Sequence, residues 1–169
     1  MRIDTPAILF EQMLQGLYSA ETQLILALPR VAARADSPEL REAIERHLEQ
    51  TRGQVSRIER IADMLKMDCS GKSCLGMMGI LKEGDEDLGY GGDPMLVDSV
   101  IIASSQKVEH YEIASYIGTL RLARDLGSRS ADVMALLTET LEEEEETDEI
   151  LNELAESLRA EGPEALTGG

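Results

Sequence analysis

Apolar residues recur along most of the chain with the spacing of an α-helix, in which each residue is rotated by about 100° from the one before it. Four long stretches follow this pattern, and a shorter stretch rich in Leu, Met and Ile lies between the second and the third. Proline, serine, aspartate and glycine residues stand at their borders, where helices start and stop. The pattern predicts a single domain over residues 1–169, with helices at about 5–33, 38–67, 74–88, 94–126 and 129–160.

The connections between these helices predict how they pack. A short connection joins the first two long helices and another joins the last two, so each pair should form an antiparallel helical hairpin. The glycine-rich segment 69–93 links the two hairpins and includes the short helix. The expected fold is therefore all-α: a ferritin-like four-helix bundle of two antiparallel helical hairpins, with an additional short helix in the crossover.

Three of the predicted helices have an acidic residue in the middle of their apolar stripe. Glu21 interrupts the stripe of the first helix, and Glu109 interrupts that of the helix at 94–126. Glu144 and Asp148 both fall inside the stripe of the last helix. A carboxylate in a core costs free energy unless it is paired or hydrogen-bonded. Carboxylates that converge from several helices are typical of metal sites in four-helix bundles.

Carboxylate oxygens suit iron, manganese or magnesium, so these are the metals that the pattern favours. A metal-free interpretation stays open at this point, because hydrogen bonds from neighbouring side chains could satisfy the same carboxylates. Tyr18 and Tyr116 lie on the stripes of Glu21 and Glu109. A buried tyrosine hydroxyl usually has a hydrogen-bond partner, so we expect both tyrosines to bond to the carboxylates of the site.

Four stretches of the chain resemble a known family. They read LYSAETQLILALP, HLEQTRGQVSRIERI, QKVEHYEIASYIGTLRLA and, near the C-terminus, ETDEIL. Together they are spread over nearly the whole chain, which resembles the YciE/YciF family of ferritin-like proteins. The resemblance implies a rubrerythrin-related helical bundle, often dimeric, that is linked with stress responses and described as a candidate ferroxidase.

The resemblance also implies a set of metal ligands, because ferritin-like proteins share a di-iron pattern. Glu21 and Glu109 match the glutamates of the first and third long helices. Glu112 matches the second glutamate that rubrerythrin-like sites place three residues later. The second long helix should supply Glu-x-x-His but does not, and Gln54 and His47 are among the nearest groups that it offers.

The last helix departs from the same pattern in a smaller way. Asp148 stands where the pattern has a histidine, and Glu144 lies closer to the apolar stripe than Glu145 does. The expected metal ligands are Glu21, Glu109, Glu112, Glu144 and Asp148, with Gln54, Glu145 and His47 as weaker candidates and Tyr18 and Tyr116 as hydrogen-bonding neighbours.

The composition excludes several classes of partner. Thirty-three acidic residues against 16 lysines and arginines give a formal net charge of −17, which repels nucleic acids and anionic lipids. No stretch is long and apolar enough for a bilayer, and the N-terminus lacks the pattern of a signal peptide, so we expect a cytoplasmic protein. Cys69 and Cys74 are too few for a disulfide scaffold, and their spacing does not indicate structural zinc.

Two functions of different classes follow from these observations. The first is a ferroxidase-type oxidoreductase, expected to be a homodimer, that holds iron or manganese between its helices. The second is a non-enzymatic helical dimer or scaffold whose buried carboxylates form a vestigial or metal-free network. The three acids in the middle of core stripes favour the first, whereas the missing Glu-x-x-His of the second long helix favours the second.

Overall fold

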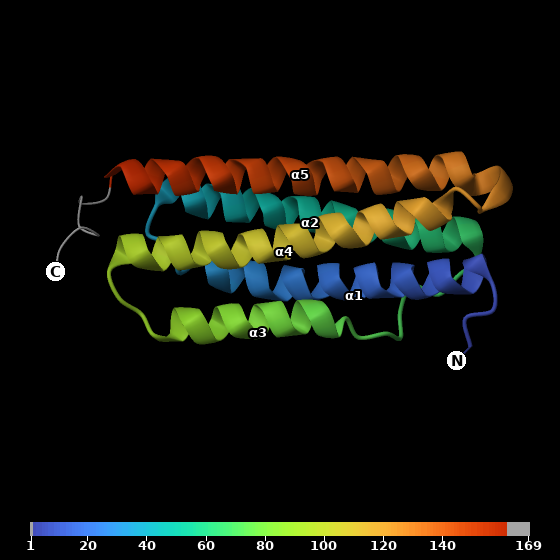
Figure 1. Ribbon diagram of the computed structural model, residues 1–169, viewed down its shortest axis with the longest axis horizontal. Coiled ribbons are helices and arrows are strands. Elements are labelled where there is room, and N and C mark those ends of the chain that lie inside the picture. The colour runs from blue at the N-terminus through green and yellow to red at the C-terminus, as the bar shows by residue number, and fades with distance from the viewer. Residues whose placement is uncertain (1, 162–169) are drawn as a thin grey trace.

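A computed structural model describes residues 2–161 of the chain (Figure 1). The helices are α1 (Pro6–Ala32), α2 (Pro38–Leu65), α3 (Leu75–Gly89), α4 (Pro94–Ala123) and α5 (Ser130–Glu161), and a 3₁₀ turn, η1 (Gly127–Arg129), precedes α5. This order of long and short helices confirms the all-α bundle expected from the sequence. None of the helices formed by residues 2–161 combines the length and the apolarity that a bilayer span requires.

The sequence signals at the helix borders act as expected. Thr5, Ser37 and Asp93 cap α1, α2 and α4, and each side chain accepts a hydrogen bond from a backbone N–H of the first turn. A proline follows each of them at the first helical position, where a backbone N–H would have no acceptor within the helix, so its absence in proline costs nothing. Helix α4 ends at Ala123, before the predicted end at 126, because the chain turns there towards Gly127, whose φ of 66° is left-handed.

The four long helices form a closed ring in which every neighbour is antiparallel (Figure 1). Helix α1 packs against α2 and α4, and α5 packs against the same two helices. The short helix α3 lies outside this ring, alongside α1 and α4, over one half of the bundle (Figure 1). The crossover between the two hairpins thus covers the groove between α1 and α4 at one end only.

The hydrophobic core is divided into two parts by a band of polar side chains. One part is built around Leu24, Leu28, Leu40, Ile44, Ile101 and Leu151, and the other around Phe10, Leu14, Ile58, Ile61, Val133 and Leu137. On each long helix, a buried polar residue stands between the residues of the two parts. These are Glu21 on α1, His47, Thr51 and Gln54 on α2, Glu109 and Glu112 on α4, and Glu144 on α5.

The close approach of α3 to α4 gives a prediction about stability. A Cβ atom at Gly76 would lie 2.6 Å from Cε2 of Tyr111, whereas a Cβ atom at Gly79, also on α3, would meet nothing within 4 Å. Gly76→Ala should therefore destabilise the protein by about 1 kcal/mol, because crowding outweighs the gain in helix propensity. Gly79→Ala is the matched control and should be neutral or stabilising in urea unfolding. Equal effects of the two substitutions would contradict the packing.

Candidate metal centre

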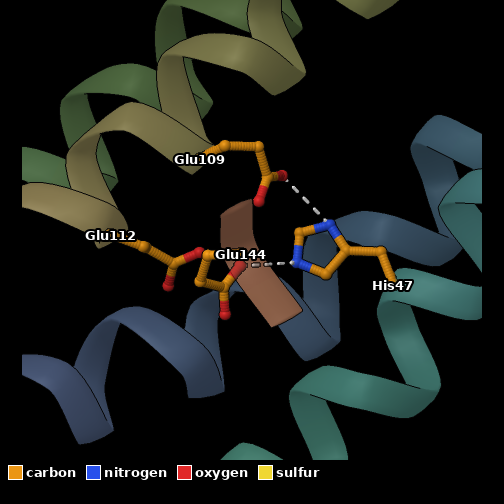
Figure 2. Close-up of side chains that lie close together, drawn as sticks. All are labelled: His47, Glu109, Glu112 and Glu144. Atoms are coloured by element: carbon orange, nitrogen blue, oxygen red, sulfur yellow. Dashed lines mark ion pairs between the residues drawn. The ribbon is translucent and has the colours of Figure 1, made fainter. Parts of the chain in front are cut away.

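Four buried side chains from three helices bring their ligand atoms together at the centre of the bundle (Figure 2). His47 comes from α2, Glu109 and Glu112 from α4, and Glu144 from α5. One ligand atom from each of them lies within 4.8 Å of the others. Glu109 and Glu112 share a face of α4 because they are three residues apart. The cluster is a set of donors that could hold a metal ion.

His47 lies between two of the carboxylates (Figure 2). Its Nδ1 is 3.2 Å from Oε1 of Glu109, and its Nε2 is 3.7 Å from Oε2 of Glu144. The histidine side chain is only 3% exposed and both glutamates are completely buried, so water does not screen these contacts. The imidazole therefore links the carboxylates of α4 and α5 from the side of α2.

Glu21 adds a fourth carboxylate from the remaining long helix. Its side chain is completely buried, and its Oε1 accepts a hydrogen bond of 2.5 Å from the hydroxyl group of Tyr116. Burial raises the pKa of Glu21 well above its usual range, and the nearby charge of Glu144 raises it further. Each of the four long helices thus contributes a side chain to the site, and Tyr116 fixes the orientation of the one from α1.

Most polar atoms of the site have no hydrogen bond of good geometry. Across residues 2–161, nine buried side-chain oxygen and nitrogen atoms lack such a bond, and all nine belong to the polar band between the two parts of the core. Seven are carboxylate oxygens, and the other two are Nε2 of His47 and Oε1 of Gln54. An unsatisfied buried polar atom costs about 1–3 kcal/mol. Carboxylate and imidazole groups are ligands of iron and manganese, so the residues present fit such an ion.

Burial makes these carboxyl groups hard to ionise. It raises the pKa of Glu109 to about 8, and the charge of Asp148 adds to the effect. Burial also raises the pKa of Glu112 well above its usual range, and the neighbouring charges of Glu21 and Glu144 raise it further. The pKa of Glu144 is raised by burial and then by the charge of Glu109. Without a bound cation, the cluster therefore holds protons near neutral pH, and a cation that binds would displace them.

Gln54, on the same buried face of α2 as His47, bonds to a charged network between α2 and α5. Its Nε2 donates to Oε2 of Glu143 at 3.0 Å, and Glu143 in turn pairs with the guanidinium group of Arg57. The Glu143 bond fixes the orientation of the amide, because Nε2 can donate there only when Oε1 faces away. The free Oε1 of Gln54 is buried. This amide is thus a buried, unbonded oxygen on the same face of α2 as His47, about two turns further along the helix.

The structure brings most of the expected ligands together but not all of them. Glu109, Glu112 and Glu144 lie in the cluster, with Glu21 next to it. Asp148 does not join them: its half-buried carboxylate lies 3.3 Å from Nε2 of His110. The physical reason is that the aspartate side chain is one carbon shorter than glutamate and that a neighbour on α4 holds it at the edge of the bundle.

Two other expected residues also lie away from the cluster. Glu145 is exposed, because one residue along a helix is a rotation of about 100° away from Glu144. The hydroxyl group of Tyr18 is 3.3 Å from Oε1 of Glu59, on α2, and does not bond to the site carboxylates that we expected it to reach. Tyr116, in contrast, makes the expected bond to Glu21.

The sequence interpretation gave His47 too little weight. His47, Thr51, Gln54 and Ile58 are all buried, at the spacing i, i+4, i+7 and i+11 of one helix face. This spacing is visible in the sequence and places the histidine on the core stripe of its helix. The Glu-x-x-His motif does not reveal this histidine, because His47 lies seven residues, about two helical turns, before Gln54, where the motif would place its histidine.

Comparison with known proteins places this chain in a family. A family model described as a domain of unknown function, DUF892, matches residues 5–162. Protein YciF of Escherichia coli (strain K12) is 39% identical over 156 residues, which cover 92% of this chain and 93% of YciF. The crystal structure of the Escherichia coli stress protein YciF superposes with a TM-score of 0.90 and 36% identity, over 95% of this chain and all of that one.

Two further solved structures have the same fold. YcfI from Rhodopseudomonas palustris, for which a structural role has been suggested, has a TM-score of 0.85 and 35% identity, over 89% of this chain and 94% of that one. A protein from Xanthomonas campestris has a TM-score of 0.72 at 24% identity, over 92% of this chain and 94% of that one, which shows the fold alone. The expected resemblance to YciF is confirmed, and this chain belongs to the DUF892 family.

Proposed function

We propose that this protein binds ferrous iron in its buried cluster and oxidises it, as a ferroxidase-type oxidoreductase. The observation that supports this most strongly is the convergence of three buried carboxyl groups and one imidazole in the core of the bundle, with all six carboxylate oxygens unbonded and Glu21 close by. Carboxyl groups this deeply buried are costly to ionise without a cation nearby. Iron is the first choice because the donor set mixes carboxylate oxygens with a nitrogen, and manganese is the second.

Ferrous iron is the substrate of the proposed reaction. Two ferrous ions would each give up one electron, and one dioxygen molecule with two protons would leave as hydrogen peroxide. With peroxide as the oxidant, the same two electrons and two protons would give two water molecules. The glutamates would bind the cations, and the protons that they release on metal binding are available to the reduced oxidant.

The individual side chains have separate roles in this proposal. Glu109, Glu112 and Glu144 would supply negatively charged oxygens, which favour the ferric product over the ferrous substrate. His47 would supply a nitrogen donor from α2. Glu21 would bind through its free Oε2, since Tyr116 already occupies its Oε1. Tyr116 would hold Glu21 in place and would not touch the iron.

Loading the protein with Fe(II) under anaerobic conditions tests the proposal. We expect iron to stay with the protein after gel filtration, and to be oxidised when dioxygen or peroxide is added. Metal content is measured by elemental analysis, and oxidation by the absorbance of the ferric product. Glu145→Gln, at an exposed position of α5, is the control and should leave iron binding and iron oxidation unchanged. Protein that retains neither iron nor manganese would contradict the proposal.

Glu109→Ala separates a metal ligand from a purely structural acid. Ligand binding stabilises a folded protein by an amount set by its affinity, so a lost metal ligand costs more stability when metal is present. We expect saturating Mn(II) to raise the melting temperature of the wild-type protein and to raise that of Glu109→Ala much less. Equal shifts in the two proteins would show that Glu109 does not bind the metal.

A non-enzymatic protein is the second candidate function. It is favoured by the incomplete motif, since Thr51 and Gln54 occupy α2 at the spacing where ferritin-like proteins have Glu-x-x-His. A structural role has also been suggested for YcfI, which is 35% identical. In this case the cluster would be a network of protonated carboxyl groups. The iron-loading experiment distinguishes the two functions, because this candidate retains no metal.

The cellular setting belongs to the same proposal. A stress response is inferred from the stress protein YciF, and a cytoplasmic location from the sequence. A homodimer is inferred from large apolar side chains on the surface, where Leu26 and Leu75 are each 73% exposed and Met78 is 48% exposed. Light scattering on the purified protein measures the oligomeric state directly, and a monomeric mass would contradict the dimer.

A further inference from the structure

A small apolar cavity lies between α1, α3 and α4, at the end of the bundle that α3 covers. Its volume is about 40 Å³. Aliphatic side chains make most of its wall, among them Leu24 from α1, Leu81 from α3 and Val108 from α4, and Ser104 and Ser105 of α4 add two hydroxyl groups. Helix α3 lies alongside α1 and α4 at this end of the bundle (Figure 1), and its side chains form one side of the cavity wall.

The inner end of the cavity is formed by the metal cluster itself. His47 and Glu109 are both part of its wall, and both are buried members of the cluster. The outer end is formed by exposed Asp85 on α3, which pairs with Arg30 on α1 at 3.3 Å. The cavity therefore begins beside a surface ion pair and ends at two of the side chains proposed to bind iron.

The size and the wall of the cavity restrict what it could hold. A water molecule needs only about 10–15 Å³ of such space, but it also needs two to four polar partners, which the part of the wall formed by Leu24, Leu81 and Val108 does not provide. A polar guest such as hydrogen peroxide would lose its hydrogen bonds to water on entering. A small apolar molecule loses none, and apolar cavities in proteins bind gases such as xenon.

We propose that this cavity is a binding site for dioxygen, held by the aliphatic side chains of α1, α3 and α4 against His47 and Glu109. The assignment of the guest rests on the proposed oxidation of iron. It goes further in two respects, since it selects dioxygen over peroxide for this route and gives the crossover helix α3 a role. Without α3, the groove between α1 and α4 would be open to water at this end.

Krypton tests the cavity independently of any iron chemistry. It is an apolar atom close to dioxygen in size, and it can be located in pressurised crystals by anomalous scattering. We expect one krypton atom in the cavity of the wild-type protein. In Ala27→Val, whose extra methyl groups would project from α1 into the cavity, we expect none. A wild-type cavity that takes up no krypton would overturn the proposal.

The rate of iron oxidation tests the role of the guest. If the filled cavity admits dioxygen a tenth of the time, oxidation of bound Fe(II) by dioxygen slows by about tenfold in Ala27→Val. Oxidation by peroxide should keep its wild-type rate. Gly84→Ala is a milder filling variant, because its Cβ would make an ordinary contact of 3.5 Å with Ser104. It should slow the dioxygen reaction to a smaller extent.

The controls separate this inference from the proposed function. Ala103→Val makes the same chemical change on the exposed face of α4 and should alter neither krypton binding nor oxidation. Anaerobic binding of Fe(II) should be equal in all these variants. Equal slowing with both oxidants, or no slowing with either, would overturn the dioxygen site. If krypton binds but the protein does not oxidise iron, the cavity is still a site for a small apolar gas, and only the proposed ferroxidase activity is contradicted.

Discussion

Between about pH 5 and pH 8, the metal-free protein is expected to lose stability as the pH rises. Burial raises the pKa of Glu109 from 4.5 to about 8 in the folded state, so the folded protein binds a proton that the unfolded chain releases. The contribution of such a group is complete below pH 4.5 and is lost as the pH rises to about 8. Over three pH units, one group of this kind changes the free energy of unfolding by roughly 4 kcal/mol.

Urea unfolding in the presence of a chelator, repeated across this pH range, measures the effect. The slope against pH gives the number of protons bound by the cluster, and a slope above one proton would show that further glutamates share the behaviour. Adding Mn(II) should reverse the slope, because the metal replaces the protons and binds more tightly as they leave. A chelated protein whose stability rises from pH 5 to pH 8 would contradict the buried, protonated cluster.

Glu112→Gln is expected to have two large effects of opposite sign. It removes a charged metal ligand, so metal affinity should fall by more than about 100-fold. Replacing a residue that only hydrogen-bonds to a metal ligand already lowers metal affinity by about 10–100-fold. It also removes a carboxyl group that must stay protonated in the folded protein. Burial raises the pKa of Glu112, so without metal the variant should be more stable than the wild type at pH 8.

The combination of effects is what identifies a functional site. A residue retained only for stability would destabilise the protein when replaced, whereas a metal ligand held in an unfavourable place does the reverse when the metal is absent. Glu145→Gln is the matched control, because it makes the same change at an exposed position of α5. Isothermal titration with Mn(II) and urea unfolding with chelator give the two quantities. A less stable Glu112→Gln protein would count against the site.

The fold was predictable because its determinants are local. The caps at Thr5, Ser37 and Asp93, each followed by a proline, set the starts of three long helices. The short loops then force each pair into a hairpin. The end of α4 was less well predicted, because a helix can stop several residues before the next strong turn residue, and here Gly127 lies beyond the last helical residue.

The site was predictable in part, for a related reason. Glu21, Glu109 and Glu144 stand in the middle of apolar stripes, and a stripe shows which side of a helix faces the core. A stripe does not show what lies opposite. The pairing of Asp148 with His110 and that of Tyr18 with Glu59 depend on the height and the rotation of neighbouring helices. No helix contains this information by itself.

The sequence by itself determined five helices, their inward faces and the acids that interrupt those faces, because helical periodicity is a property of each segment. The tertiary structure decided which donors meet. It brought His47 to Glu109 and Glu144, held Asp148 at the edge and left a mostly apolar cavity beside the cluster. Such contacts join residues far apart in the chain, and they depend on how whole helices are positioned against one another.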